Sequence, residues 1–305
     1  MPDLKDVIII GGGGAGLTAA LYTSRAKLST ILFEKLTPGG QIALTDVVEN
    51  YPGFPEGITG PEISMKMEEQ AKKYGTQIAY EEIKSIQKSG EIFEIKTASK
   101  IHSARSVILA CGASFRMLNV PREKELTGKG VSYCATCDGA FFKGKEIVVV
   151  GGGDSALQEG LFLTRFATKV SIIHRRDKLR ASPILQERAK AAPQIQFIWD
   201  SVVESIQGEK KVEGVQLKNL KSGETTGFKT DGVFIFIGHD PNTAFIKGFV
   251  QMDDHGYVTT DPQLRTSVPG VFAAGEIRAG AVKQLVAAAG EGCEAALQAQ
   301  AYLDH

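Results

Sequence analysis

The sequence lacks an excess of charge of either sign, because 35 Lys and Arg residues balance 35 Asp and Glu residues. A balanced chain sets up no global positive field for nucleic acid or an anionic membrane surface, so any anion recognition must come from local basic clusters. No apolar run approaches the ~18 residues that span a bilayer, and the start, MPDLKDVIII, lacks the basic and apolar parts of a secretion signal. We therefore expect a cytoplasmic protein that binds neither nucleic acid nor membrane.

Cysteine is scarce, with 4 residues in 305, whereas glycine is frequent, with 34. Two of the cysteines lie close together in the motif CATC. Because the cytoplasm keeps thiols reduced, such a pair is more often redox-active or metal-binding than a structural staple. The glycines indicate many tight turns, and the length is typical of two domains.

The chain opens on a pattern of strand, glycine-rich turn, helix and strand. A β-branched run over residues 7–10 leads directly into GGGGAG. A helix is expected over residues 17–27 and a second buried strand over residues 30–33. This order is the start of a nucleotide-binding α/β unit.

The residues of this turn have the spacing of a dinucleotide signature. The glycines read Gly11-x-Gly13-x-x-Gly16, and Glu34 follows about 20 residues later, where such folds place an acid. Gly11 permits the turn, Gly13 lets the backbone approach a pyrophosphate, and Gly16 packs the helix close to the strand. The helix N-terminus then faces the negative charge. The pattern favours a dinucleotide site over the alternative of a purely structural turn.

A second copy of the signature follows the run EIVVV in the middle of the chain. Its spacing is Gly151-x-Gly153-x-x-Ala156, with alanine as the permitted third small residue. The position that corresponds to Glu34 holds His174, which begins the basic stretch HRRDKLR. The acid of the first copy is therefore replaced by basic residues in the second.

This difference in charge predicts two different nucleotides. A carboxylate such as Glu34 accepts hydrogen bonds from a free ribose 2′-hydroxyl but repels a 2′-phosphate, whereas guanidinium groups bind the phosphate. We expect FAD or NAD at the first turn, and NADP(H) at the second through Arg175, Arg176 and Arg180. The alternative for the second stretch is a solvated basic turn.

Each copy continues with a helix, a meander of short strands and a buried strand that ends in glycine. The tail holds one further buried strand, near residues 270–276, and an Ala-rich helix. We infer that this tail returns to the first copy, so that the second copy is inserted in a discontinuous domain. The expected boundaries are residues 1–112 and 245–305 for the outer domain and 113–244 for the inner one.

The cysteine pair, Cys134 and Cys137, has three interpretations: half of a zinc site, an inert pair or a redox dithiol. Tetrahedral zinc needs four ligands, and the other cysteines, Cys111 and Cys293, are single residues in apolar segments, where free cysteine packs as a small hydrophobe. The pattern favours the dithiol. Asp138 follows the pair and is either an acid that moves protons or a turn residue before glycine.

Two nucleotide sites and a reversible disulfide together suggest an electron relay. Nicotinamide gives hydride, whereas a disulfide is reduced through thiolate chemistry, so a converter is needed, and flavin fills that role. FAD is therefore the expected occupant of the first site.

With these motifs the chain resembles the bacterial-type, low-molecular-weight thioredoxin reductases from end to end. The matching segments are GGGGAG, GGQI, VENYPGF, CATCDG, GGGDSA, HRRDKLR, IGHDPNT and VFAAGE. The resemblance implies an α/β fold with two Rossmann-like three-layer domains, the NADPH domain being inserted in the FAD domain. It also implies a homodimer that reduces thioredoxin or a thioredoxin-like protein, and a rotation of one domain on the other about the two crossings.

The resemblance assigns roles by position. Cys137 would face the flavin, Cys134 would attack the partner's disulfide, and Asp138 would be the acid. The positions that would contact FAD are Gly11, Gly13, Ala15, Gly16, Glu34, Gly40, Gln41, Asn50, Gly275, Glu276, Lys283, Gln284 and Leu285. Those that would contact NADPH are Gly151, Gly153, Asp154, Ser155, Ala156, His174, Arg175, Arg176 and Arg180.

Three positions depart from the family pattern. Glu276 stands where the family usually has Asp, the segment 283–285 reads KQL in place of Arg-Gln-Ala, and Cys111 stands where Thr is frequent. These departures concern the flavin contacts and potential and leave the expected fold unchanged. Two other functions stay open: a flavoprotein that serves a peroxidase or glutaredoxin-like partner, and a non-enzymatic NADPH-binding redox sensor.

Overall fold

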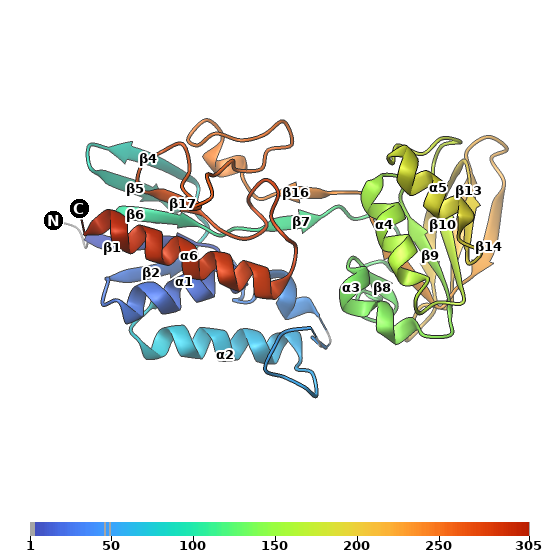
Figure 1. Cartoon of the computed structure of the whole chain (residues 1–305), viewed down its shortest axis with the longest axis horizontal. Helices are drawn as coiled ribbons and strands as arrows, with labels where there is room; N and C mark the ends of the chain where they lie inside the picture. The colour runs from blue at the N-terminus through green and yellow to red at the C-terminus, as the bar shows by residue number, and fades with distance from the viewer. Residues whose placement is uncertain (1–3, 46, 49, 305) are drawn as a thin grey trace. The chain divides into compact units, whose positions relative to one another are not determined.

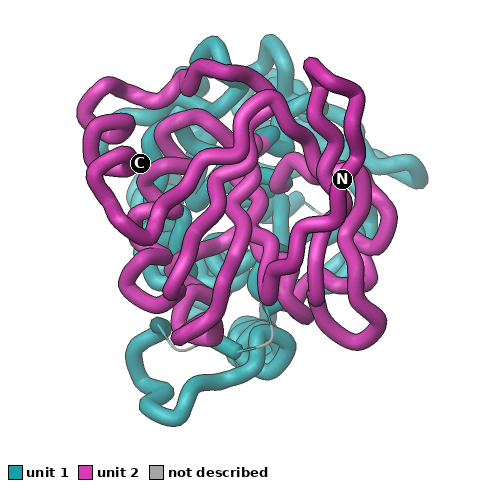
Figure 2. Tube along the Cα trace, turned by 90° about the vertical axis from the view of Figure 1, so that its right-hand side faces the viewer, with its two compact units in different colours: residues 1–114, 240–305 teal, residues 115–239 magenta. Residues whose placement is uncertain are grey.

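The computed structural model describes residues 4–45, 47–48 and 50–304, which form two compact units. Unit 1 consists of the described residues up to Ser114 and from Asp240 onward, and unit 2 consists of Phe115–His239 (Figure 2). The expected boundaries at 112/113 and 244/245 lie near these two crossings of the chain. At the crossings, two short strands, β7 (Ala113–Phe115) and β16 (His239–Pro241), pair with each other.

Unit 1 is built on a mixed sheet whose hydrogen-bonded order is β3-β2-β1-β6-β5-β4, with β17 paired to β6 (Figure 1). The pairs β1–β2, β2–β3, β1–β6 and β6–β17 are parallel, whereas β4–β5 and β5–β6 are antiparallel. The strands are β1 (Leu4–Ile10), β2 (Thr30–Phe33), β3 (Gln77–Ala79), β4 (Ser85–Ser89), β5 (Ile92–Lys96), β6 (Ile101–Leu109) and β17 (Val271–Ala273).

One face of this sheet is covered by helices α1 (Gly14–Arg25) and α6 (Leu285–Leu303), which lie side by side (Figure 1). Small residues on both helices, among them Ala19 and Ala295, are fully buried with Val7 of β1 in one apolar cluster. The last strand and the last helix therefore belong to the same sheet and core as the first. Unit 1 also contains α2 (Gly60–Lys73) and the short helices η1 (Gly40–Leu44) and η3 (Ala244–Ile246).

Unit 2 repeats this layered plan with a parallel sheet of order β11-β10-β9-β15-β8. Its strands are β8 (Val131–Ser132), β9 (Glu146–Val150), β10 (Lys169–Ile173), β11 (Ile195–Ile198) and β15 (Gly232–Ile235). A separate antiparallel sheet consists of β12 (Ser201–Gln207), β13 (Gly214–Asn219) and β14 (Thr225–Lys229). The helices are α3 (Ala135–Asp138), η2 (Gly139–Phe142), α4 (Asp154–Leu163) and α5 (Pro183–Ala191).

The two faces of the parallel sheet in unit 2 have different partners, because successive strand residues point to opposite sides. Ile147 and Val149 of β9 are buried in one cluster with Leu157 of α4, on the helical side. Val148 and Val150 are buried in another with residues of the antiparallel sheet. Helices, parallel sheet and meander make three layers, which confirms the expected Rossmann-like α/β class.

Within the described ranges, no helix combines the length and the apolar character that a bilayer crossing requires.

Candidate active site

The first glycine turn is closely packed at two of its three positions. Gly11 has φ +108°, and a Cβ there would lie 2.3 Å from the carbonyl oxygen of Ala110 on the neighbouring strand. A Cβ on Gly16 would lie 1.8 Å from the carbonyl oxygen of Gly11. Both contacts are with backbone atoms that directly follow β6 and β1, and these atoms cannot move aside without disturbing the two strands. Only glycine therefore fits at either position. The first and third glycines therefore have the structural roles that their spacing predicts.

The middle glycine of the turn is different, because a Cβ on Gly13 would meet no atom of the described residues within 4 Å. Gly13 is the N-cap of α1, and within the part of the chain that the structure describes no side chain caps that helix end. Gly40, with φ +58°, lies beside it, since a Cβ there would come 3.4 Å from the Gly13 Cα. An open, glycine-lined helix N-terminus fits a pyrophosphate, which the unpaired N–H groups and the helix dipole attract.

Glu34 lies at the end of β2, next to this turn. Its Oε2 atom accepts a hydrogen bond from the Gly12 N–H at 2.9 Å, and Oε1 accepts one from the Leu36 N–H at 3.1 Å. The carboxylate is therefore fixed beside the glycine turn, where it can accept from a ribose hydroxyl.

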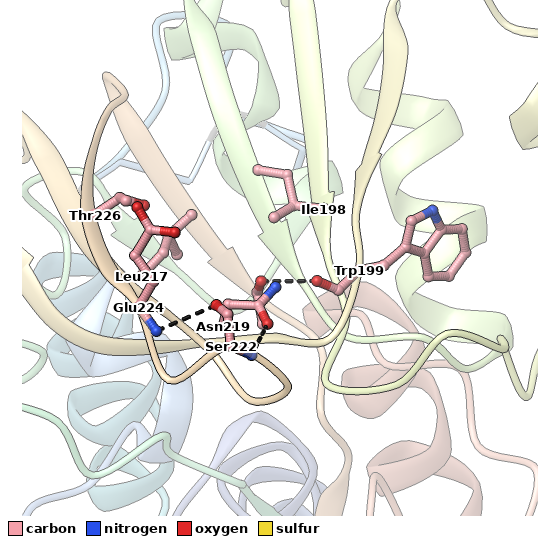
Figure 3. Close-up of a pocket in the computed structure, with 8 residues that line it drawn as sticks. Ile198, Trp199, Leu217, Asn219, Ser222, Glu224 and Thr226 are labelled. Carbon is pink, nitrogen blue, oxygen red and sulfur yellow. Dashed lines mark hydrogen bonds between the residues drawn. The ribbon is translucent and has the colours of Figure 1, made fainter.

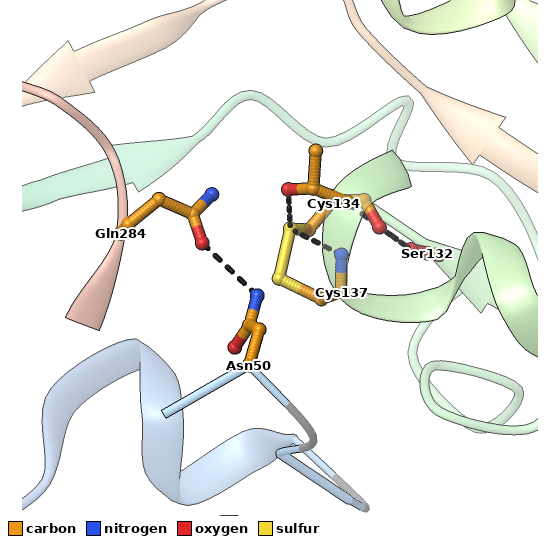
Figure 4. The surroundings of a disulfide bond; sticks show 6 residues. Asn50, Ser132, Cys134, Cys137 and Gln284 are labelled. Atoms are coloured by element: carbon orange, nitrogen blue, oxygen red, sulfur yellow. Dashed lines mark hydrogen bonds between the residues drawn. A yellow bond between two sulfur atoms is a disulfide. The ribbon is translucent and has the colours of Figure 1, made fainter. Parts of the chain in front are cut away.

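The other predicted flavin residues of unit 1 make contacts among themselves and with the first turn. The Gln41 side chain donates to the Ala113 carbonyl at 3.1 Å, and Asn50 donates to the Gln284 side chain at 3.1 Å (Figure 4). A Cβ on Gly14 would lie 2.4 Å from the Leu285 side chain, so the first residues of α1 and α6 lie side by side. Ala15 is buried and Lys283 is exposed.

Sequence reasoning did not find an ion pair that holds the loop after β17. Arg278 donates two hydrogen bonds to the Glu291 carboxylate, at 3.0 and 2.5 Å, and both side chains are mostly buried. Glu291 also accepts the N–H of Gly275 at 2.6 Å. The chain on both sides of Glu276 is thus fixed to Glu291, through Gly275 and Arg278; burial raises the pKa of Glu276, which Lys283 partly offsets.

The second glycine turn, in unit 2, has the same division between packed and open positions. A Cβ on Gly151 would lie 2.5 Å from the Phe236 carbonyl oxygen and 2.6 Å from the Ala156 Cβ. A Cβ on Gly153, the N-cap of α4, would meet none of the described atoms within 4 Å. The geometry again fits a pyrophosphate at a helix N-terminus.

His174 occupies the place in unit 2 that Glu34 occupies in unit 1. A Cβ on Gly152 would lie 2.2 Å from His174 Nδ1, just as Glu34 adjoins Gly12. The imidazole is buried, with Nε2 3.0 Å from the Lys178 carbonyl oxygen, and burial lowers its pKa. The lowered pKa favours the neutral ring, so the positive charge of this loop must come mainly from other residues.

The charge of this loop comes from exposed guanidinium groups. Arg175, Arg176 and Arg180 are all exposed, and the Arg180 N–H donates to the Gly152 carbonyl at 2.8 Å. That hydrogen bond connects the basic loop directly to the glycine turn. Asp154, at the start of α4, accepts the Ser182 N–H at 2.6 Å, and Ser155 beside it is exposed.

The cysteine pair is a disulfide in unit 2, between Cys134 and Cys137, with a Cα–Cα distance of 5.4 Å (Figure 4). Both cysteines are half-buried. Cys134 is the N-cap of α3, and its sulfur accepts the Cys137 N–H at 3.2 Å. Ser132 accepts the Cys134 N–H at 3.1 Å, and Asp138 donates its own N–H to the Cys134 carbonyl at 3.2 Å. An N–H aimed at Cys134 sulfur would stabilise a thiolate there.

A buried carboxylate next to this motif was also missed. Glu123 is 1% exposed and accepts the hydroxyl of Tyr133, the residue before Cys134, at 2.7 Å. It lies in the charged run PREKE, which reads as ordinary surface.

The two remaining cysteines differ from the pair. Cys111 donates from its sulfur to the Ile10 carbonyl at 3.2 Å, and burial raises its pKa to about 12. A thiol with so high a pKa carries little of the reactive thiolate at neutral pH, so we expect Cys111 to react slowly. Cys293 lies half-buried on α6 and is also free.

A recess of about 250 Å³ lies in unit 2 at the ends of β11 to β14, with the Trp199 ring pointing away from it (Figure 3). None of the predicted site residues lines this recess. It carries no part of the proposed chemistry.

Comparison with known proteins gives consistent results. The model of the pyridine nucleotide-disulphide oxidoreductase family matches residues 5–292. The chain is 53% identical to the thioredoxin reductase of Bacillus subtilis (strain 168), over 99% of this chain and 95% of that protein. It is 51% identical to the thioredoxin reductase of Listeria monocytogenes, over 99% and 94%.

Solved structures agree with this. The crystal structure of thioredoxin reductase from Streptococcus pyogenes MGAS5005 is 44% identical, covers 100% of this chain and 99% of its own, and superposes with a TM-score of 0.96. Lactococcus lactis thioredoxin reductase in the FR conformation is 46% identical over 98% and 99%, and its TM-score is 0.68.

Proposed function

This chain belongs to the thioredoxin reductases of the pyridine nucleotide-disulphide oxidoreductase family, and we propose that it passes electrons from NADPH through FAD to the Cys134–Cys137 disulfide. The dithiol formed in this way then reduces the disulfide of thioredoxin or a thioredoxin-like protein. The observation that carries the proposal is the pairing of two open glycine turns, one beside Glu34 and one beside a basic loop, with a disulfide in the second unit.

Unit 1 would hold FAD. The open N-terminus of α1 at Gly13 would receive the pyrophosphate, and Glu34 would accept from the ribose. Gln41, Asn50 and Glu276 would surround the rest of the molecule. Bound FAD would supply the conversion of hydride chemistry into two-electron reduction of a disulfide.

Unit 2 would hold NADPH. The open turn at Gly153 would bind the pyrophosphate, while Arg175, Arg176 and Arg180 would bind the 2′-phosphate through charge-assisted hydrogen bonds. His174, which is buried and contacts the Lys178 carbonyl, would keep this loop in place. The two units thus use the same turn and select different nucleotides by charge.

The thiol chemistry follows from the position of the pair at a helix start. Two electrons and one proton break the bond between the two sulfur atoms and leave one cysteine as a thiol and the other as a thiolate; Asp138 would donate this proton or accept it, so that Cys134 can react as the thiolate. Cys134, with the Cys137 N–H aimed at its sulfur, would attack the partner's disulfide and form a mixed disulfide. Cys137 would then attack Cys134, which releases the partner as a dithiol and restores the original bond.

Three further properties rest on the family. They are a homodimer, a cytoplasmic location and a rotation of unit 2 about the two chain crossings, which would let one disulfide serve both flavin and partner. Two solved relatives of nearly equal identity superpose on the whole chain to very different extents, which supports such a rotation.

The test replaces one sulfur. Cys134→Ser should abolish thioredoxin reduction while leaving bound FAD and NADPH oxidation by an artificial electron acceptor intact. Cys293→Ser, a free cysteine on α6, is the matched control and should keep all three. Thioredoxin reduction by the Cys134→Ser protein at the wild-type rate would refute the thiol assignment, and the same assay with peroxidase and glutaredoxin-like acceptors identifies the partner. A colourless protein that takes up no FAD and does not oxidise NADPH would favour a redox sensor instead.

A further inference from the structure

A buried carboxylate joins the redox motif to the segment that enters unit 2. The Tyr133 hydroxyl donates to Glu123 Oε1 at 2.7 Å, and the same carboxylate accepts the N–H groups of Leu118 at 2.8 Å, Asn119 at 2.7 Å and Val120 at 3.3 Å. Burial and the adjacent carboxylate raise the pKa of Tyr133, so the phenol keeps the proton that it donates. With four donors, a carboxylate that is 1% exposed is satisfied, which makes it a rigid connection.

The ring of Tyr133 makes a second connection, to both chain crossings. It stacks on Phe115 of β7 with ring centroids 5.1 Å apart and an angle of 18°. Phe115 in turn contacts the His239 ring of β16 at 4.8 Å. The backbone agrees, because the Arg116 N–H donates to the Gly238 carbonyl at 3.0 Å. We call Phe115, Glu123, Tyr133 and His239 the unit 2 anchor.

Unit 1 has its own attachment on the other side of the crossings. Asn242 donates from its side chain to the Cys111 carbonyl at 2.8 Å and from its backbone to the Gly112 carbonyl at 3.1 Å. It also accepts the Ser114 hydroxyl at 3.0 Å. Between Asn242 and the unit 2 anchor, each crossing therefore has only a few residues, those of one short strand, in which the chain can bend.

We propose that Tyr133 and Glu123 are positioning residues for the disulfide, because they fix Cys134 to the unit 2 ends of β7 and β16, so that these ends and the redox motif turn as one body. The inference rests on the proposed function. In a rotation about the crossings, the disulfide would then move together with unit 2 and reach one defined orientation. Loosening the anchor would leave the sulfur atoms chemically unchanged but spread over more orientations, of which fewer are productive.

Tyr133→Phe is the sharpest perturbation, since it keeps the ring on Phe115 and removes only the hydroxyl. Rapid mixing of the holoenzyme with NADPH separates reduction of the flavin from its reoxidation by the enzyme's own disulfide. We expect reoxidation to slow about threefold to tenfold, the latter being about 1.4 kcal/mol, while reduction by NADPH stays within about twofold. Tyr80→Phe, which removes another tyrosine hydroxyl from a glutamate, Glu68, is the control and should change neither step.

A second measurement uses the full chain without FAD. In Tyr133→Phe the amides of Leu118 and Asn119 should exchange hydrogen faster, because their acceptor has lost a partner. Equilibration with dithiothreitol should show an unchanged disulfide equilibrium, since the lost hydroxyl bonds Glu123 and neither sulfur. A purely structural weakening would instead shift both half-reactions or the thermal midpoint. Glu123→Gln, an isosteric change, should reproduce the slower reoxidation more strongly.

Equal slowing of both half-reactions, or no change in either, would overturn the anchor. A wild-type enzyme that takes up no FAD or reduces no disulfide would instead defeat the proposed function, so the two failures are distinguishable. If Glu123→Gln does not fold, Tyr133→Phe decides the question alone.

Discussion

One substitution separates binding from folding at the second glycine turn. Gly153 has φ −97° and ψ −178°, an extended conformation that any residue adopts, and a Cβ there would lie more than 4 Å from every atom of the described ranges. Replacing glycine by alanine at a compatible position stabilises by about 0.4–1 kcal/mol through the unfolded chain. Alanine is the poorer N-cap, which costs a similar amount. The two effects nearly cancel, so the free energy of unfolding of Gly153→Ala should stay within about 1 kcal/mol of wild type.

Binding should change far more than stability. The methyl group would stand in the open space at the start of α4, where the pyrophosphate of NADPH must approach the backbone. We expect the Michaelis constant for NADPH to rise by about tenfold or more, which corresponds to at least ~1.4 kcal/mol. Bound FAD should not change, because the substitution lies in the other unit.

Gly151→Ala is the contrasting variant two residues away. Its Cβ would lie 2.5 Å from the Phe236 carbonyl oxygen, so the backbone itself must move. Overpacking of this kind costs about 1–3 kcal/mol. Thermal and denaturant unfolding, FAD content and NADPH kinetics of the two variants complete the test. A wild-type Michaelis constant in Gly153→Ala would refute the placement of the pyrophosphate, and unfolding of that variant as severe as that of Gly151→Ala would refute the open space.

Three further predictions concern single side chains. Replacing Arg175 and Arg176 by Gln should raise the Michaelis constant for NADPH at least about tenfold and that for NADH less than about twofold, because phosphate contacts are worth about 1.5–3 kcal/mol each; equal effects would place the 2′-phosphate elsewhere. Cys111, with a pKa of about 12, should resist iodoacetamide at pH 8 in the folded protein while reduced Cys134 is alkylated, as mass spectrometry would show; rapid labelling of Cys111 would contradict its burial. Because burial lowers the pKa of His174, the unfolded chain binds a proton that the folded chain does not, from that lowered pKa up to about 6.5. The free energy of unfolding should therefore rise with pH through this window, and the penalty for burying the ring should be gone above it. His174→Asn should reduce the slope of the free energy of unfolding against pH, measured by urea titrations from pH 5 to 8. An unchanged slope would count against the lowered pKa of His174.

The glycine turns were predictable because their causes are local. A strand that turns sharply into a helix needs glycine where backbone meets backbone, as at Gly11 and Gly16, and the residue at the end of the next strand must adjoin the turn. The structure accordingly places Glu34 beside Gly12 and His174 beside Gly152. Sequence spacing did not reveal that His174 is buried, since most of the stretch that it begins is charged and exposed.

The two buried carboxylates could not be predicted in this way. Glu123 and Glu125 stand in the same charged run, and only the fold turns the first inward to meet Tyr133. Glu291 lies on an Ala-rich helix, and its partner Arg278 comes from the loop after β17, so the pair depends on where two elements pack. No local periodicity carries that information. The available signal was weak: an acid within an otherwise small and apolar helix face.

The chain crossings also depend on contacts between distant residues, so their exact positions could not be predicted from the sequence. Strands β7 and β16 have only three residues each, too few for an alternating pattern. The domain boundaries predicted from the sequence were therefore placed after a glycine and near the end of a motif. What defines the crossings instead is contact between distant residues: Asn242 with Cys111 on one side, and Phe115 with His239 and Tyr133 on the other. If a rotation acts here, it must act within the paired strands, because both ends are held. The residues that control the rotation are then those that fix the ends of β7 and β16. They make buried hydrogen bonds and ring contacts and do not belong to flexible loops.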